Sequence, residues 1–255
     1  MLLLLSTLYV TPSSAGLVGG GGVPKPGEIS LAHRGVLFLD ELPEFSRAAL
    51  EVLRQPMEDR HVTIGRAKAV YQFPAHFLLV ASMNPCPCGL WGADSSGSEE
   101  AGCFCSPIKV MQYRSRISGP LLDRIDLHVE VPRVPYSQLT LQDSPLSSET
   151  MRETVERTHQ VQLQRYRNLG LTFNSELSGR LLREFCRLES DASSLLENAF
   201  HSLGLSVRSH DRILKIARTI ADMEDFANIA TPHIAEALQY RCLDKKQQTP
   251  PLFRS

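Results

Sequence analysis

Two short runs of apolar residues, each followed at once by polar ones, organise the first half of the chain. Residues 36–39 read Val-Leu-Phe-Leu and lead into Asp40 and Glu41; residues 77–81 read Phe-Leu-Leu-Val-Ala and lead into Ser82-Met-Asn84. A short continuous apolar run is typical of a strand buried on both faces, as in a parallel sheet. Ligands of open α/β sheets bind just beyond the carboxyl ends of such strands. The pattern therefore predicts two buried strands whose polar ends line a ligand site.

Helical and hairpin patterns surround these two strands. Apolar residues at helical spacing, or alternating apolar and polar residues, indicate the elements. We expect helices over 44–55 and 108–118, a hairpin of 61–64 and 69–73 with a basic tip at 65–68, and a strand over 125–131. Gln55-Pro56 is expected to end the first helix. Residues 11–27 are rich in Gly, Pro and Ser and are predicted to be loop or linker.

From residue 149 onward the chain shows helical patterns alone. The predicted helices span residues 149–167, 177–188, 192–203, 207–223 and 232–243. Ser206 is expected to cap the helix that begins at residue 207, and Thr231 to cap the last one, with Pro232 in its first turn. No internal repeat is visible.

These patterns predict an α/β block followed by an all-α block. The expected divisions are a disordered or non-native start at 1–14, the α/β domain at 15–135, a Ser-rich linker at 136–148, the helical domain at 149–245 and a disordered tail at 246–255. The apolar start, Met1 to Leu5, is too short to span a bilayer and lacks the charged beginning of a signal peptide. We expect a chain that begins in the middle of a larger protein.

Composition and charge narrow the protein's class. The 255 residues are 42% hydrophobic and 22% charged, with a net charge of −1, which is typical of a globular protein with no general attraction to nucleic acid or membranes. Four of the six cysteines form two C-x-C pairs, unlike a secreted disulfide framework. A reducing, cytoplasmic location fits better.

The acidic pair at the end of the first strand suggests phosphate chemistry. Asp40 is placed to hold Mg²⁺ beside a nucleotide, and Glu41 to orient or deprotonate an attacking water. The alternative is a buried strand that ends in a solvated acidic turn. The residues alone leave both interpretations open.

The two cysteine pairs, Cys86 with Cys88 and Cys103 with Cys105, are separated by 14 residues. Two such pairs supply the four thiolates of a tetrahedral Zn²⁺ site, although C-x₂-C spacing is commoner. Reduced thiols and disulfides are the alternatives. Cys186 and Cys242 are expected in helical cores. His33 and His76 have no visible partners and are interpreted as structural.

The chain resembles the Mg-chelatase-like branch of the AAA+ ATPases, and more narrowly its YifB/ComM-type competence proteins. The resemblance covers residues 15–243 and rests on several motifs in the same order. They are Gly27-Glu-Ile-Ser-Leu-Ala-His33, Gly35-Val-Leu-Phe-Leu-Asp-Glu-Leu-Pro-Glu-Phe45, Met83-Asn-Pro-Cys-Pro-Cys-Gly89, Tyr113-Arg-Ser-Arg-Ile-Ser-Gly-Pro-Leu-Leu-Asp-Arg-Ile-Asp126 and Arg212-Ile-Leu-Lys-Ile-Ala-Arg-Thr-Ile-Ala-Asp222.

The resemblance implies a role for each polar residue of the set. Asp40 matches the Walker-B ligand of Mg²⁺, and Glu41 matches the catalytic glutamate. Asn84 matches sensor 1, which contacts the γ-phosphate of ATP. Arg124 matches the arginine finger that reaches a neighbouring subunit's nucleotide, and Arg208 matches sensor 2. A site shared between subunits implies a homo-oligomeric ring, expected to be a hexamer. Competing candidates for the two arginine roles are Arg116 and Arg212.

The chain departs from the family in one large feature. Members carry a phosphate loop upstream of the Walker-B strand, but no G-x-x-x-x-G-K-[ST] motif occurs in these 255 residues. We therefore expect a partial AAA+ sheet without the phosphate-loop strand, followed by a helical lid. Without the loop, nucleotide affinity is expected to collapse and the chain alone to be inactive as an ATPase. A fragment, a split gene or a wrongly chosen start codon would explain the difference.

The family also suggests a partner. Arg66 and Lys68 at the hairpin tip are candidates for contacts with DNA phosphates in a ring's central channel, and an ordinary solvated turn is the alternative. The parent activity implied by the resemblance is ATP-driven DNA remodelling and branch migration in competence and recombination. The alternatives are the ATPase subunit of a magnesium chelatase, which metallates a porphyrin, and a non-catalytic remnant that docks onto related subunits. No segment suggests a membrane partner.

Overall fold

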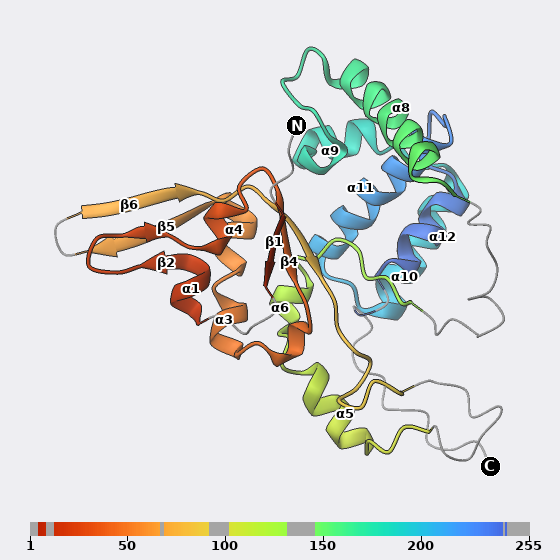
Figure 1. The fold of residues 1–255 in the computed structure, drawn as a ribbon. Helices are drawn as coiled ribbons and strands as arrows, with labels where there is room; N and C mark the ends of the chain where they lie inside the picture. The colour runs from red at the N-terminus through yellow and green to blue at the C-terminus, as the bar shows by residue number, and fades with distance from the viewer. Residues whose placement is uncertain are drawn as a thin grey trace. The chain divides into compact units, whose positions relative to one another are not determined.

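The computed structural model describes residues 5–8, 13–66, 69–91, 102–131, 146–241 and 243. The chain divides into two compact units, Met1–Ile125 and Asp126–Ser255. The first unit contains the sheets and the second is built from helices (Figure 1). The predicted order, an α/β region followed by helices, is therefore present. The predicted linker at 136–148 and tail at 246–255 lie almost wholly outside the described residues.

A small parallel sheet forms the centre of the first unit. Its strand order is β1-β4-β7, so that β4 (Val36–Leu39) lies between β1 (Leu5–Leu8) and β7 (Leu78–Ala81). In β4 the side chains of Leu37 and Leu39 are fully buried, whereas the alternate residues are half-buried. All three strands run parallel, so their carboxyl ends meet at one edge. β1 forms within the range expected to be a disordered start.

The second predicted strand is present, but its predicted burial is wrong. Leu78 and Val80 of β7 are 61% and 40% exposed. Among the described residues, β7 pairs with β4 alone and is an edge of the sheet. Leu79 is partly buried against the core, so β7 is covered on one face. An apolar run cannot by itself distinguish a strand covered on both faces from one that is covered on one face.

Helices and two hairpins complete the first unit. The described elements are α1 (Ser14–Val18), β2 (Gly19–Gly20), β3 (Lys25–Pro26), α2 (Glu28–Leu31), the 3₁₀ helix η1 (Leu42–Glu44), α3 (Arg47–Glu51), α4 (Arg54–Asp59), β5 (His61–Arg66), β6 (Ala69–Pro74), α5 (Pro107–Arg114) and α6 (Gly119–Leu122). The predicted hairpin is confirmed as β5 and β6, which pair from His61 with Pro74 to Arg66 with Ala69.

The predicted loop at 11–27 is wrong in part, because it contains a helical turn and a tight hairpin. Gly19 has φ +96°, and a Cβ there would lie 2.2 Å from the carbonyl oxygen of Lys25. A Cβ on Gly27 would lie 2.3 Å from the carbonyl oxygen of Leu17. The glycines therefore allow backbone segments to approach more closely than any side chain permits.

The single helix predicted over 44–55 is also wrong. Ser46 interrupts it, since its Oγ accepts a hydrogen bond from the N–H of Ala49 at 3.2 Å and so caps the new helix α3. Pro56, expected to end the helix, instead lies in the first turn of α4, where its missing N–H leaves no hydrogen bond unmade. The helix predicted over 108–118 is present as α5 but ends at Arg114, and the separate short helix α6 begins only at Gly119.

The strand predicted over 125–131 does not form. Only His128 makes a bridge, to Arg241, and its side chain is buried. The alternating apolar residues Leu127, Val129 and Val131 are 50%, 66% and 81% exposed. Burial does alternate along this segment, but the polar residue His128 is buried and its apolar neighbours are exposed.

The two histidines interpreted as structural do have partners. The backbone N–H of His76 donates to Nδ1 of His33 at 3.1 Å, and the N–H of Arg34 donates to the carbonyl oxygen of His76 at 2.6 Å. These bonds join the segments that precede β4 and β7, so the two histidines help to align the strands.

The second unit is a cluster of helices around its own core. The elements are α8 (Ser148–Tyr166), the 3₁₀ helix η2 (Asn174–Glu176), α9 (Gly179–Phe185), α10 (Ser190–Leu203), α11 (Val207–Met223) and α12 (Thr231–Gln239). The bounds of α11 match the prediction, and Ser206 caps it by accepting from the N–H of Ser209 at 3.1 Å. Ala230, not Thr231, occupies the cap position of α12. Cys186 is buried in this core, as expected.

One buried carboxylate joins three elements of the helical unit. Asp222 of α11 accepts hydrogen bonds from Arg165 at 2.7 Å, from Asn174 at 2.9 Å and from Nε of Arg218 at 3.0 Å. Arg218 and Asp222 are about 1% exposed. Buried charges persist only when they are paired and hydrogen-bonded, so this network fixes how α8, η2 and α11 pack.

Candidate functional site

The carboxyl edge of the parallel sheet brings Asp40, Glu41 and Ser82 into direct contact. The register pairs Leu39 with Ala81, so the next residues on the two strands, Asp40 and Ser82, lie opposite each other. The Ser82 hydroxyl donates to Oδ1 of Asp40, and the backbone N–H of Glu41 donates to the same oxygen at 3.0 Å. No hydrogen bond from the described residues reaches Oδ2. The half-buried carboxylate is thus oriented through one oxygen, and the other is available to a ligand.

The backbone at Glu41 has an uncommon conformation. Its φ and ψ are 52° and 48°, in the left-handed region. Two bonds between strand ends hold this turn: the N–H of Ser82 donates to the carbonyl oxygen of Leu39 at 3.0 Å, and the N–H of Leu42 donates to that of Ser82 at 2.8 Å. Such strained residues in proteins cluster at functional sites. The exposed Glu41 carboxylate is therefore presented beside Asp40 by a fixed backbone.

Asn84 lies two residues beyond Ser82 and is exposed at the same edge of the sheet. Helix α5 supports this segment, because Nε of Arg114 donates to the carbonyl oxygen of Pro85 at 3.1 Å. Burial, followed by the charge of Glu44, raises the pKa of the α5 residue Tyr113, whereas the neighbouring backbone of Asn84 opposes this shift. Tyr113 and Ser82 are the supporting residues that the sequence analysis did not single out as site residues. The position of Ser82 directly after the apolar run 77–81 could have indicated it, whereas no local pattern marks Tyr113.

The structure places the two arginine candidates of the first unit differently. Nη1 of Arg116 donates to the carbonyl oxygen of Pro43 at 3.0 Å and to Glu44 at 3.1 Å, so its half-exposed guanidinium lies over the turn that follows the acidic pair. The side chain of Arg124 is only 8% exposed, and its Nη2 lies 2.8 Å from Glu58. The predicted arginine finger is thus held within its own unit.

The remaining basic candidates have separate surroundings. Arg208 is an exposed residue in the first turn of α11, in the second unit, whereas Arg212 is largely buried there and paired with Asp126. Burial lowers the pKa of Arg212, although Asp126 opposes the shift. Arg66, at the end of β5, donates from Nη2 to the carbonyl oxygen of Gly21 at 2.8 Å. Lys68 lies outside the described residues.

The cysteine pairs converge. The sulfurs of Cys86, Cys88, Cys103 and Cys105 all lie within 4.8 Å of one another. They belong to the segment that follows β7, which also carries Asn84, and to the segment that precedes α5.

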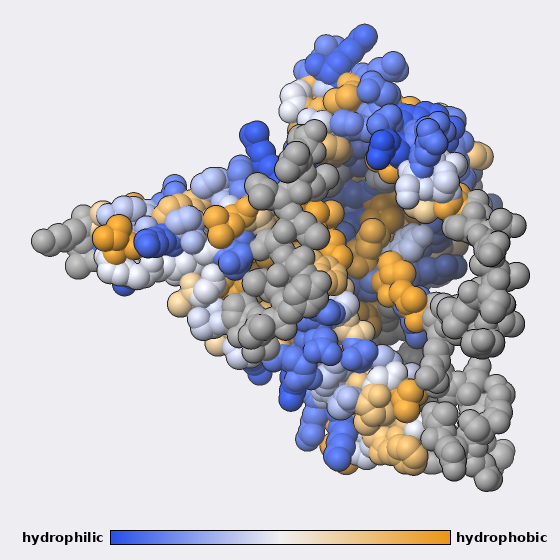
Figure 2. Space-filling view, in the orientation of Figure 1, coloured by the Kyte–Doolittle hydropathy of each residue, from blue (hydrophilic) through white to orange (hydrophobic). Residues whose placement is uncertain are grey.

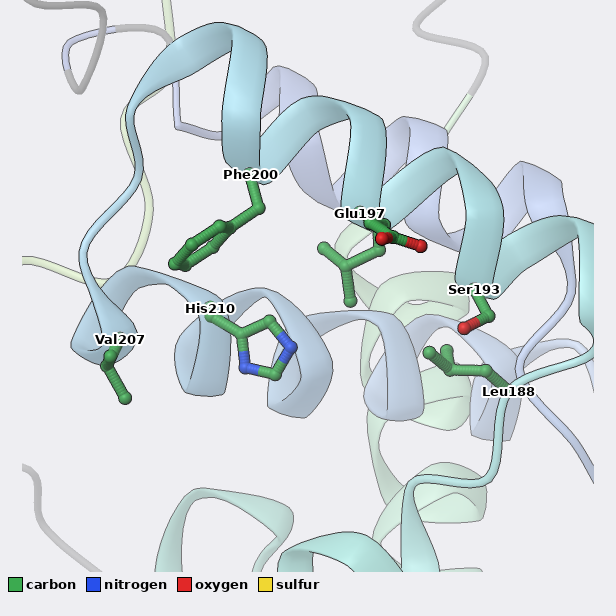
Figure 3. Close-up of a pocket in the computed structure, with 7 residues that line it drawn as sticks. Leu188, Ser193, Glu197, Phe200, Val207 and His210 are labelled. Carbon is green, nitrogen blue, oxygen red and sulfur yellow. The ribbon is translucent and has the colours of Figure 1, made fainter.

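An open groove of about 410 Å³ lies in the second unit between α10 and α11. In Figure 3, Glu197 and Phe200 project from α10 toward Val207 and His210 of α11. None of the sequence-predicted site residues lines it, and Val207 is the neighbour of Arg208 in the chain.

The donor set at the sheet edge fits one part of a Mg²⁺–nucleotide site. Carboxylate and hydroxyl oxygens are ligands that Mg²⁺ prefers, and Asp40, Glu41 and Ser82 supply them. The phosphate-binding part has no counterpart, since the sequence has no phosphate-loop motif. None of the helices in the described part of the chain has the length and apolar character that crossing a membrane requires.

Comparisons with known proteins show the family to which the chain belongs. A family model described as magnesium chelatase, subunit ChlI, matches residues 6–139, and the model of the C-terminal part of the same subunit matches residues 145–241. Competence protein ComM of Haemophilus influenzae is 46% identical over 232 residues, which are 91% of this chain and 43% of the relative. The uncharacterized protein YifB of Escherichia coli is 42% identical over 234 residues, 91% of this chain and 44% of the relative. The chain spans less than half the length of these relatives.

Proposed function

Because the chain belongs to the magnesium-chelatase-like (ChlI) family, we propose that it is part of an AAA+ ATPase that couples ATP hydrolysis to the remodelling of DNA. The relative from H. influenzae is named a competence protein, and competence is the uptake of DNA. The proposal extends to a homo-oligomeric ring that performs branch migration during recombination.

The observation that carries the proposal is the contact between Asp40 and Ser82 beside Glu41. Asp40, oriented by Ser82, would hold the Mg²⁺ of a bound nucleotide through its other oxygen. Mg²⁺ at this position would offset the negative charge of the phosphates. Glu41 would accept the proton of the attacking water, and the Asn84 amide would donate to the γ-phosphate.

The arginine roles remain part of the proposal. An arginine finger stabilises the charge on the transferring phosphoryl group. Arg124 could serve a neighbouring subunit only after its pair with Glu58 opens, whereas Arg116 lies over the acidic turn of its own chain. Arg208 would act as the second sensor from the helical unit.

The chain alone is expected not to hydrolyse ATP, because it has no phosphate-loop sequence. The test is therefore a chimera in which the upstream region of H. influenzae ComM precedes residues 15–255 of this chain. We expect the chimera to hydrolyse ATP in the presence of Mg²⁺ and the same chimera with Glu41→Gln to bind ATP without hydrolysing it. Hydrolysis that is unchanged by Glu41→Gln would refute the proposed role of the site.

The DNA role needs a second measurement on the same chimera. We expect ATP-dependent migration of a four-way DNA junction that the Glu41→Gln chimera does not perform. Insertion of Mg²⁺ into a porphyrin without any DNA-dependent activity would instead identify the ATPase subunit of a chelatase. A chimera that folds and forms rings but shows neither activity would identify a non-catalytic docking protein.

A further inference from the structure

Four cysteine sulfurs meet in one small cluster on the first unit. The sulfur of Cys86 lies 3.2 Å from that of Cys88 and 3.6 Å from that of Cys103, and the sulfurs of Cys88 and Cys103 are 3.4 Å apart. Together with the Cys105 sulfur, all four lie within 4.8 Å of one another. The pairs come from opposite sides of a 14-residue interval, so the chain has folded back to bring them together.

These separations fit four ligands of a single tetrahedral ion. A Zn–S bond of about 2.3 Å gives an edge of about 3.8 Å between sulfurs around the ion. A disulfide requires two sulfurs about 2.05 Å apart and joins cysteines in pairs. Here three sulfurs instead form a nearly equilateral triangle. In an iron–sulfur cluster the thiolates bind different metal atoms and therefore stand farther apart.

The surroundings of the sulfurs also suit thiolates. The backbone N–H of Cys105 donates to the sulfur of Cys103 at 3.4 Å, and Cys86 is fully buried whereas Cys88 is exposed. Hydrogen bonds from the backbone to ligand sulfurs are the usual second shell of a metal–thiolate centre. A site whose four positions are all filled by protein ligands, with one side buried and the other exposed to solvent, is typical of a structural ion.

We propose that Cys86, Cys88, Cys103 and Cys105 bind one Zn²⁺ as four thiolates. The ion fastens the segment after β7, which carries Asn84, to the start of α5, which begins at Pro107. Arg114, at the end of α5, contacts Pro85, so the same two segments meet again at the far end of this helix. The centre therefore positions the Asn84 segment, and its existence does not depend on the proposed ATPase function.

Packing supports α5 on one side only, where Val110 and Tyr113 are buried. Phe104, Ile108 and Met111 are 84%, 62% and 48% exposed. Figure 2 shows apolar side chains gathered on the surface of α5. The exposed apolar residues gain little from burial, and a bound ion would add folding free energy to this segment.

The first test measures metal in the full chain purified without added metal or chelator. We expect inductively coupled plasma mass spectrometry to find one zinc per chain. After replacement of the metal by Co²⁺ alone, we expect the visible absorption bands of tetrahedral cobalt bound to four thiolates. No metal and no cobalt spectrum would overturn the proposal, as would iron with acid-labile sulfide. Fewer than six reactive thiols after unfolding in chelator without reductant would indicate disulfides and would overturn it too.

Variants separate ligands from neighbours. Cys88→Ser and Cys103→Ser should each lower zinc affinity by more than the roughly 10–100-fold typical of losing a second-shell partner. Phe104→Ala, between two ligands, and Cys186→Ala, a cysteine of the other unit, should retain one zinc per chain. Because Cys88 is exposed, its serine variant is expected to fold, and circular dichroism would verify this. Full zinc content in both serine variants would overturn the assignment.

Discussion

The hydroxyl of Ser82 donates a hydrogen bond to Oδ1 of Asp40, across the two neighbouring strands β7 and β4. This bond selects which carboxylate oxygen faces the protein and which is left for a ligand. It makes Ser82 a positioning residue for the proposed Mg²⁺ site. The first prediction follows from it.

We expect Ser82→Ala to lower the Mg²⁺ affinity or activity of the ComM chimera by about 10–100-fold, the usual effect of losing a second-shell partner. A titration of ATPase rate against Mg²⁺ concentration measures the shift. Ser82→Thr keeps the hydroxyl and should retain most of the activity. If Ser82→Ala matches the unmodified chimera at every Mg²⁺ concentration, the hydrogen bond has no role in metal binding.

Arg124 and its partner Glu58 provide the second prediction. If Arg124 acts on a neighbour's nucleotide, Arg124→Ala should lower turnover by at least about 10³-fold. Glu58→Gln, which releases the arginine, should lower it by less than about tenfold. Turnover of assembled rings is the measurement, with unfolding by urea as the control for stability. Equal losses in the two variants would assign the pair a purely structural role and favour Arg116.

The Asp222 network gives a prediction about stability. Asp222→Ala leaves the guanidinium groups of Arg165 and Arg218 without their carboxylate, the latter in the core. Removing one partner of a buried ion pair typically costs about 3–5 kcal/mol. Unfolding in urea, followed by circular dichroism, should show that loss in the transition of the helical unit. Asp225→Asn, at an exposed position with φ 60° that asparagine tolerates, should change stability little.

Cys186 predicts a pH dependence. Burial raises the pKa of its thiol from 9.0 to about 12. Between these two pH values the thiol is deprotonated in the unfolded chain but still protonated in the folded chain. The contribution of Cys186 to the free energy of unfolding is therefore complete below pH 9 and is lost as the pH rises toward 12. Above pH 9 the loss is at most about 1.4 kcal/mol per pH unit. Urea unfolding at several pH values should show a steeper alkaline decline in the wild-type chain than in Cys186→Ala; parallel declines would contradict the prediction.

The basic hairpin tip gives a prediction about DNA. The β5–β6 hairpin projects from the rest of its unit (Figure 1), and Arg66 stands near its end. If Arg66 and Lys68 each contact a phosphate, the double variant with alanine at both positions should reduce the slope of log affinity against log salt by about two. Fluorescence anisotropy of the chimera with forked DNA measures this slope. Arg180→Ala, which removes a 90% exposed arginine of the helical unit, should leave it unchanged.

Elements with strong, unambiguous patterns could be predicted from the sequence. The bounds of β4 and α11 were correct, because an apolar run between turn residues and a long helical period each permit one interpretation. The helix over 44–55 failed because Ser46 offered a competing cap within a helical period. The strand over 125–131 failed because alternation does not say which face is covered, and here it is the face of His128.

The candidate site was predictable to the same degree. That Asp40, Glu41 and Asn84 end neighbouring parallel strands followed from the apolar runs that precede them. The contact of Asp40 with Ser82 could not be foreseen, because it depends on strand register, which the sequence does not state. The pairing of Arg124 with Glu58 depends on how α4 and α6 pack, and no local pattern records it.

The left-handed backbone of Glu41 has a consequence for evolution and design. A residue with a side chain costs about 1–2 kcal/mol in this conformation, whereas glycine adopts it freely. Selection for a sturdier fold alone would favour glycine at position 41 and would discard the carboxylate. At this turn, higher stability and retention of the carboxylate exclude each other. Variants evolved only for resistance to heat are therefore expected to lose Glu41 first.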